Sequence, residues 1–486
     1  MKRLLFPLLA LGLVFIPGTV WADDDFGFGD GTSASSPAFS LGSVGVKISG
    51  EVSAELLAFT DDFETADKIK QGKLGDVFSG ALNFSVSGKA AAAVINLNLA
   101  PVFDGSASPV TIDEAYVRAY FGPVDIEGGV RKLTWGKADS FGPLDVINPL
   151  DYTDLTKISD PMSVKIGRPL VHVSWGIGSF SKLEGVFVPW FQGHRFATDG
   201  RWAPAQITGL VPSLTAGLKS VLSQHPKIPA FFLPTILDNL DTWQNSVDIE
   251  EYYRGGDTSL QYAQGGLRFT TTIGSSDLGG QYYYGRLPRP AIDVRLAEYF
   301  ADPLLDPNKI RIAPVDYNAY HQVGVDYAQV LFGFNVRAEV AANITEDLKG
   351  DKGDIYNPSL AWSLGFDRDV IAGINVNLQV TESIRLFHDQ IGKDPLVIDS
   401  EEGKDTTFTR LTLQLSKKFF RDRLRLKATG LWDIEEKGFL IMPAVAWIQS
   451  DVSVELSGGI FGGDEDGELG QYRDNHFIKA VLTYSF

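Results

Sequence analysis

The last eleven residues of the chain, HFIKAVLTYSF, alternate strictly between two sets of side chains. Successive side chains of a β-strand point to opposite faces, so this run predicts a strand with one apolar and one wetter face. The apolar face carries Ile478, Ala480, Leu482, Tyr484 and Phe486. The other face carries Phe477, Lys479, Val481, Thr483 and Ser485. Few folds accept such a strand, because its apolar side needs either a core or lipid.

The same alternation recurs from residue 46 onward in segments of about ten residues, the length of a membrane-spanning strand. In 374–380, INVNLQV, every second residue is apolar and the others are amides. The segments are 46–59, 78–87, 91–99, 112–121, 124–135, 169–176, 182–190, 260–273, 278–287, 319–330, 336–344, 358–366, 374–380, 411–415, 424–432, 439–448, 452–460 and 476–486. They predict an all-β, antiparallel transmembrane barrel of about eighteen strands, with sixteen as the alternative.

The connections between these segments alternate between short and long. Single-chain bacterial barrels have short turns on the periplasmic side and longer loops outside. Turns such as 274–276 and 449–451 alternate with loops, of which 136–168, 191–259 and 288–318 are the longest. This predicts an even number of strands with both ends periplasmic. Apolar residues at helical spacing predict two amphipathic helices within 191–259.

Three regions follow from composition. Residues 1–22 combine Lys2 and Arg3 with an apolar run and small residues before Asp23, which predicts a secretory signal peptide. Residues 23–45 are rich in Asp, Gly and Ser and predict a flexible periplasmic lead-in, followed by the barrel over 46–486.

Charge and cysteine content narrow the function. The net charge of −18 becomes −20 when the two basic residues of the signal are removed, which argues against nucleic-acid binding. With no cysteine in the chain, closure of the sheet rather than disulfides must stabilise it.

The terminal strand resembles the C-terminal strand of Gram-negative outer-membrane barrels, which end on Phe. That resemblance implies an outer-membrane location, contact with lipid and lipopolysaccharide, and delivery to the barrel-assembly machinery through Phe486. Arg131, Trp135-Gly136, Asp145, Asn148-Pro149 and Asp151, with the strand 113–118 before them, resemble the signature of a family of uncharacterised porin-like barrels. The family implies the fold and location but no solute. Trimers are usual among similar porins, so a homotrimer is the oligomer to expect.

In general porins the third loop folds into the channel, and here that loop is 136–168. It carries Asp139, Asp145, Asp151 and Asp154. Basic residues predicted to face the lumen are Arg118, Arg131, Arg268, Arg337, Arg385, Arg410, Arg425 and Lys427. An acidic loop against a basic wall would create a transverse field that selects solutes by charge. The alternative is that these charges pair only with one another and hold the loop in place.

Other functions remain open on the sequence. The helices of 191–259 either pack on each other and partly cap the mouth or capture hydrophobic compounds through Leu210, Leu214, Phe231, Phe232, Leu237 and Trp243. A plugged barrel with a structural or adhesive role is a further alternative.

Catalysis and metal binding have little support. His172 and Ser174 share one face of a strand, but no base or oxyanion hole can be assigned, so no enzyme is predicted. Asp464-Glu465-Asp466-Gly467-Glu468 is only a fragment of a calcium loop, and we expect no cofactor or metal.

Overall fold

The computed structural model describes residues 38–41, 44–60, 78–99, 110–247, 256–257, 259–291, 317–393, 401 and 403–486. The predicted signal peptide 1–22 lies outside the described residues, as do most of the predicted lead-in and of the loop 288–318. In the described part, the first element is β1 (Ala38–Leu41), which pairs with the start of β2 and lies within the predicted lead-in.

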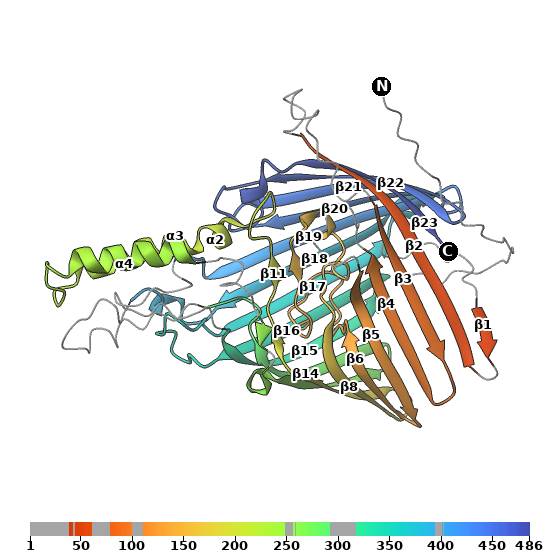
Figure 1. Cartoon of the computed structure of the whole chain (residues 1–486). Helices are drawn as coiled ribbons and strands as arrows, with labels where there is room; N and C mark the ends of the chain where they lie inside the picture. The colour runs from red at the N-terminus through yellow and green to blue at the C-terminus, as the bar shows by residue number, and fades with distance from the viewer. Residues whose placement is uncertain are drawn as a thin grey trace, which may run out of the picture.

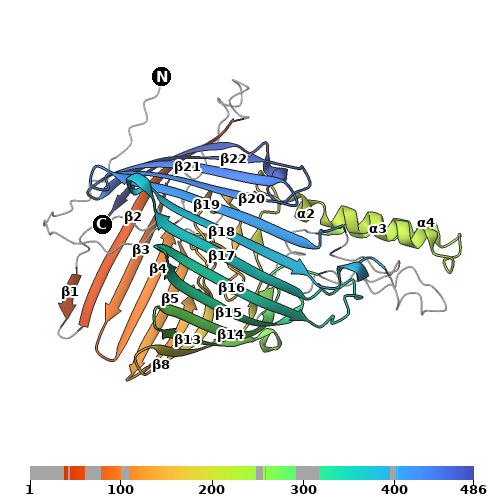
Figure 2. The ribbon, with the colours of Figure 1, turned by 180° about the vertical axis from the view of Figure 1, so that it is seen from behind.

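Eighteen antiparallel strands form a closed barrel in the described chain, as predicted (Figures 1 and 2). They are β2 (Val44–Phe59), β3 (Phe78–Ser87), β4 (Ala91–Leu99), β5 (Val110–Phe121), β6 (Val124–Arg131), β8 (Arg168–Ile177), β9 (Ser181–Val188), β13 (Gln264–Ile273), β14 (Ser276–Arg286), β15 (Ala319–Leu331), β16 (Phe334–Thr345), β17 (Ser359–Asp369), β18 (Asn375–Arg385), β19 (Thr407–Phe419), β20 (Leu424–Asp433), β21 (Gly438–Gln449), β22 (Val452–Gly462) and β23 (Phe477–Ser485). Each pairs with its neighbour in the sequence of barrel strands, and closure leaves no open edge for aggregation.

The barrel closes where β23 pairs with β2, from Glu51↔Ser485 to Phe59↔Phe477. Beyond the last paired residue, Gly50 and Phe486 exchange two backbone hydrogen bonds of 2.9 Å. A Cβ on Gly50 would lie 2.7 Å from Phe486 Cζ, so the close approach of the aromatic ring requires glycine here. The terminal Phe is therefore part of the seam.

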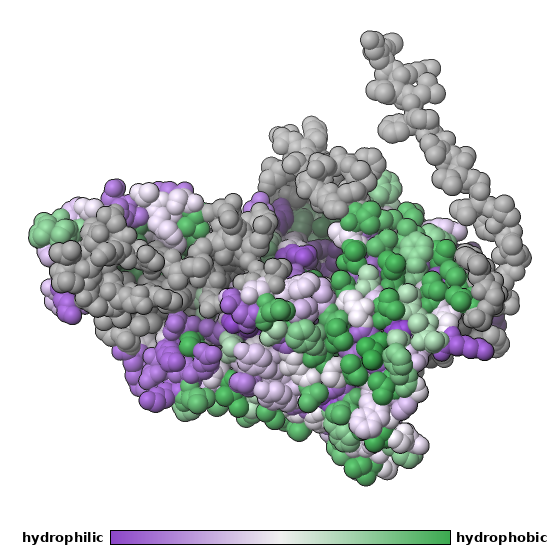
Figure 3. All heavy atoms as spheres, turned by 60° about the horizontal axis from the view of Figure 1, so that its bottom comes forward, coloured by the Kyte–Doolittle hydropathy of each residue, from purple (hydrophilic) through white to green (hydrophobic). Residues whose placement is uncertain are grey.

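The two faces of the wall differ in polarity, as the alternation predicts. On β16, Val340 and Ile344 are 43% and 40% exposed on the outer face, while Glu339 is 2% exposed on the lumen face. Figure 3 shows hydrophobic residues gathered over the outer wall. An apolar outer belt with a polar interior is the arrangement that lipid imposes on a barrel.

Helices occur in the loop between β9 and β13, as predicted. They are α2 (Ala205–Thr208), α3 (Leu210–Gln224) and α4 (Leu233–Ser246). α3 and α4 lie side by side and extend away from the barrel, not across its mouth as one interpretation of the sequence expected (Figures 1 and 2). No helix in the described residues has the length and apolar character needed to cross a membrane.

The remaining elements are short. They are β7 (Asp151–Tyr152), β10 (Phe191–Gln192), β11 (Arg195–Phe196), β12 (Gly256–Asp257), and the 3₁₀ turns η2 (Leu155–Lys157), η3 (Leu260–Tyr262), η5 (Ile371–Gly373), η6 (His388–Gln390) and η7 (Gly470–Tyr472). Pairing of β7 with β11 is parallel and joins two loops that belong to different pairs of barrel strands.

Candidate functional site

Residues 132–167, here named the inner loop, leave β6 and fold against the lumen side of the opposite wall. The backbone N–H groups of Lys137, Ala138 and Leu144 donate to the carboxylate of Glu339 on β16, with Ala138 at 2.7 Å and Leu144 at 3.2 Å. Those of Asp139 and Ser140 donate to Gln379 Oε1 on β18 at 3.0 and 3.1 Å. These acceptors lie on the lumen face, so the inner loop lies inside the barrel.

Two glycines make the approach to Glu339 possible. Gly136 has a φ of +101°, and a Cβ there would lie 2.4 Å from Glu339 Oε1. A Cβ on Gly142 would lie 2.7 Å from Glu339 Oε2. The loop backbone thus wraps around one buried carboxylate, and side chains at these two positions would displace it.

Apolar contacts hold the inner loop against two different parts of the wall. Trp135 and Ile147 pack with Leu170 of β8 and with Tyr283 of β14. Further along the loop, Leu155 and Ile158 belong to a second cluster with lumen-facing residues of β20 to β23. The members contributed by those strands are Leu431, Leu440, Met442, Phe461 and Phe477. The inner loop therefore spans the lumen, and each contact removes apolar surface from water.

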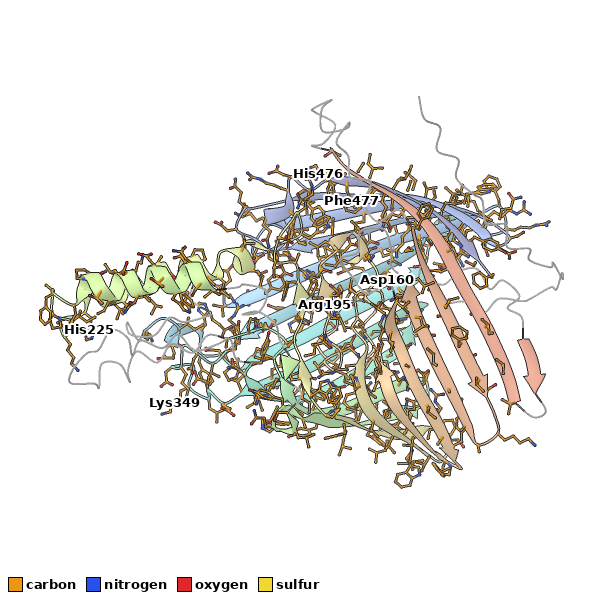
Figure 4. All side chains as sticks on the ribbon, viewed as in Figure 1. Asp160, Arg195, His225, Lys349, His476 and Phe477 are labelled. Atoms are coloured by element: carbon orange, nitrogen blue, oxygen red, sulfur yellow. The ribbon has the colours of Figure 1, made fainter. Side chains whose placement is uncertain are left out.

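A second segment, residues 189–204, also enters the barrel. Its β11 pairs with β7 of the inner loop, and Arg195 lies 2.8 Å from Asp151. The ring of Trp202 lies 5.6 Å from those of Phe59 and Phe461. Figure 4 shows Arg195 and Asp160 within the barrel outline, whereas His225 lies at the far end of the helical hairpin. The sequence analysis placed residues 191–204 in the long outer loop 191–259, and nothing in their pattern predicted that they enter the barrel.

The four predicted acidic loop residues occupy different environments. Asp139 lies 2.5 Å from Arg337 of β16, and burial raises the pKa of its carboxyl group. Asp145 lies 2.5 Å from Lys165 within the same loop, and burial raises its pKa as well. Asp151 accepts from Thr153 and Arg195. At Asp154, burial opposes ionisation, but Lys157 at 3.2 Å and the hydrogen bonds from Thr156 outweigh it and lower the pKa.

Most of the predicted basic wall residues pair with wall or outer-loop carboxylates. Arg118 and Arg131 share Glu127. Arg268 lies 2.7 Å from Asp326, Arg385 lies 2.7 Å from Glu401, and Arg410 lies 2.6 Å from Asp433. Arg425 lies at the start of β20, and Lys427 is two residues further along the same face. The Asp139–Arg337 ion pair joins a predicted acidic loop residue to a predicted basic wall residue.

Signature residues of the inner loop have structural roles. Asn148 is 5% exposed; it accepts from Leu133 N at 2.7 Å and donates to Arg131 O at 2.9 Å and to Ile166 O at 2.8 Å. It therefore joins the two ends of the loop. Trp135 is 2% exposed in the apolar contact with β8 and β14.

The histidine considered for catalysis lies within hydrogen-bond distance of two carboxylates. His172 is 5% exposed on the lumen face, with Nδ1 2.9 Å from Glu127 and Nε2 3.2 Å from Glu184. In the acidic loop, Asp464 lies 3.1 Å from Lys437 and Glu468 lies 3.3 Å from Arg410. No group of three or more metal-ligating side chains comes together in the part of the chain that is described.

No family model matches the chain, and no curated protein matches its sequence. Solved structures similar to it include OmpF of Salmonella typhi in complex with daunomycin, with 8% identity, 93% of this chain and 100% of that chain covered, and a TM-score of 0.41. The structure of Pseudomonas aeruginosa OccK9 is 8% identical, with 91% of this chain and 98% of that chain covered and a TM-score of 0.42. The DcaP channel of Acinetobacter baumannii is 10% identical, with 91% of this chain and 97% of that chain covered and a TM-score of 0.38. Since these scores are low, the fold assignment depends on the strand pairing described above.

Proposed function

We propose that this chain is a porin-like channel in the outer membrane of a Gram-negative-type bacterium, through which small solutes diffuse passively. The observation that carries the proposal is a loop bonded to the lumen face of a closed barrel through Glu339 and Gln379. A barrel of eighteen strands encloses enough width for water, and an inward loop narrows it. Contacts with lipopolysaccharide, the barrel-assembly machinery and two further copies of the chain belong to the same proposal.

The selective element in this proposal is the inner loop against β16 and β17. Arg337 lies 2.5 Å from Asp139 of the loop and 3.1 Å from Asp367 of the wall. Two carboxylates and one guanidinium leave a net negative group beside the passage. Fixed charge at a narrow, low-dielectric point acts strongly on passing ions, so this group favours cations.

Planar-bilayer recording with purified protein tests both parts. We expect ohmic conductance from the wild type and a reduced preference for cations in Asp139→Asn, read from the reversal potential in a salt gradient. Asp389→Asn is the matched control, because Asp389 is exposed in an outer loop beside Lys393. Absence of conductance in the wild type would overturn the channel, and equal reversal potentials in the three proteins would overturn the filter.

A plugged barrel is the second candidate, and the apolar clusters inside the lumen favour it. In that case the wild type is silent and conducts only when the inner loop is detached, for example by Glu339→Gln. The hydrophobic-capture alternative is weaker. Leu214 is buried, whereas Phe231 is 73% exposed. The ring of Phe231 contacts that of Phe232 in a tilted arrangement, with centroids 4.2 Å apart, at the end of the hairpin furthest from the barrel.

A further inference from the structure

A cavity of about 150 Å³ lies where the inner loop, the segment 189–204 and the wall meet. Its apolar lining includes Phe141, Leu150 and Phe191. Its polar lining includes Arg168 of β8, Gln264 of β13 and His194 of the second loop segment. The cavity is therefore amphipathic, and residues from both inward segments and from the wall have to be in place to form it.

Arg168 is a buried cation in this lining. It is 3% exposed, and it donates to the backbone oxygens of Ile147 at 2.8 Å and Trp190 at 2.7 Å. In the described chain no carboxylate lies within ion-pair distance of it, and its Nε has no hydrogen-bond partner. Burying a charge without a counter-charge is costly, so an anion in the cavity would stabilise this arginine.

Gln264 and His194 also offer donors. Gln264, 3% exposed, uses Oε1 to accept from Tyr283 at 3.2 Å and from the Arg286 amide at 3.1 Å, and its Nε2 has no partner among the described residues. His194 accepts the Leu150 N–H at Nδ1, so the neutral ring carries its hydrogen on Nε2. Burial lowers the pKa of His194 to about 3, which keeps the ring neutral.

One carboxylate, Asp145, also lines the cavity. Its charge is offset by Lys165, whose Nζ lies 2.5 Å from it. Arg168 therefore remains a cation of the lining with no carboxylate beside it in the described chain, and Gln264 and His194 add hydrogen-bond donors. That balance selects an anion with acceptor oxygens over a cation or a neutral solute.

We infer that this cavity binds a small organic monocarboxylate, with the carboxylate toward Arg168 and Gln264 and the short aliphatic end against Phe141, Leu150 and Phe191. An apolar cavity of about 150 Å³ holds a molecule the size of benzene, so an acid of about six non-hydrogen atoms fits. The inference rests on the proposed function, because it names the class of solute that a channel of this design would hold.

Isothermal titration calorimetry of the full-length barrel in detergent tests it, with butyrate as the probe and butyramide as its uncharged counterpart. We expect saturable binding of butyrate and at least tenfold weaker binding of butyramide. Gln264→Glu keeps the acceptor oxygen and the side-chain shape but supplies the cavity with its own carboxylate, so butyrate binding should fall at least tenfold.

Gln414→Glu is the matched control, because it adds the same charge to the lumen face of β19, away from the cavity. Its butyrate affinity should equal that of the wild type, and slower migration of unheated barrels on gels would reveal any variant that has not folded. Equal binding of butyrate and butyramide, no saturable butyrate binding, or an unchanged affinity in folded Gln264→Glu would overturn the inference.

Recording in potassium chloride separates this result from the proposed function. If the wild type conducts current but does not bind butyrate, the carboxylate site is overturned and the proposed channel stands. If the wild type binds butyrate but conducts no current, the proposed channel is overturned and the site is that of a plugged barrel.

Discussion

Asp139 of the inner loop and Arg337 of β16 form an ion pair with 2.5 Å between carboxylate and guanidinium, although 198 residues separate them in the sequence. Arg337 also binds Asp367 of β17 through both of its terminal nitrogens, each at 3.1 Å. The guanidinium is the cation between two carboxylates, so it holds the loop against the wall and reduces the negative local charge without cancelling it.

Replacing Arg337 with Ala should make the channel more cation-selective and the inner loop looser. Asp139 and Asp367 would then repel each other, and a half-buried pair of this kind stabilises by about 1 kcal/mol. Reversal potentials measure the first effect, and current noise measures the second. Arg337→Lys, which keeps the charge but not the bidentate contact, should retain most of the selectivity; equal selectivity of Arg337→Ala and wild type would contradict the prediction.

Glu339→Gln should release the first half of the inner loop. One oxygen of the carboxylate accepts from Lys137 and Ala138 and the other from Leu144, so the amide nitrogen of Gln would face an N–H. An unsatisfied buried donor costs about 1–3 kcal/mol. Trypsin should then cleave at Lys137 faster in detergent-solubilised barrels.

Glu382→Gln is the control for that substitution. Glu382 lies on the outer face of β18, where Trp362 Nε1 donates to it at 2.6 Å, away from the inner loop. Trypsin should cleave the Glu382→Gln barrel at the wild-type rate. A wild-type rate in Glu339→Gln as well would show that the Glu339 carboxylate does not hold the loop.

Asn148→Ala should destabilise the closure of the inner loop without unfolding the barrel. Three backbone groups, on Leu133, Arg131 and Ile166, lose the partner that joins them. We expect a loss of about 1–3 kcal/mol, seen as faster hydrogen exchange at the Leu133 amide. Asn375→Ala, at the start of β18 where Asn375 bonds to Asp369 at 3.0 Å, should leave exchange in the loop unchanged.

Packing of the second inward segment should weaken as the pH falls below 6.5. Burial, together with the nearby Arg289, lowers the pKa of His194 from 6.5 to about 3. Between those values a detached loop binds a proton that the packed loop does not, so the stabilisation is complete above pH 6.5 and is lost as pH falls toward 3.

Hydrogen-exchange protection of the Leu150 amide measures this, because that N–H donates to His194 Nδ1 at 2.9 Å. A His194→Asn barrel should show a weaker dependence on pH over the same range, since carboxylates titrate in both proteins. Parallel curves for the two proteins would rule out His194 as the titrating group.

Gly50→Ala should reduce the yield of closed barrel. Its Cβ would lie 2.7 Å from Phe486 Cζ and from Ala81 O. The fraction of protein that migrates as a compact band without heating measures closure. Gly128→Ala is the control, because nothing lies within 4 Å of a Cβ at that position. Normal closure of Gly50→Ala would show that the seam tolerates a displaced ring.

The strands could be predicted from the sequence because alternation is local: the residues of each strand alone show which of its faces is apolar and which is polar. β13 shows the limit, since it begins at Gln264 and not at residue 260. Residues Leu260–Tyr262 form a 3₁₀ turn in which Ser259 Oγ accepts from Gln261 N at 3.4 Å. Alternation in side-chain type cannot distinguish a capped turn from one more pair of strand residues.

The interior was harder to predict, because its contacts join residues far apart in the chain. The acidic residues of the loop could be found by type, but their partners could not. Asp145 pairs with Lys165 of its own loop, whereas Ala138 bonds to a side chain 201 residues away. Trp202 is another case, because a lone aromatic residue in a loop gives no sign that it packs on Phe59 and Phe461.

The placement of the inner loop has a consequence for biogenesis. Its partners Glu339, Gln379 and Phe477 lie on strands that are synthesised long after the loop itself. Because Phe477 lies on β23, the loop has its full set of contacts only after the last strand has joined the wall. A chain truncated before β23 would therefore lack both the seam with β2 and the apolar contact between Phe477 and the loop.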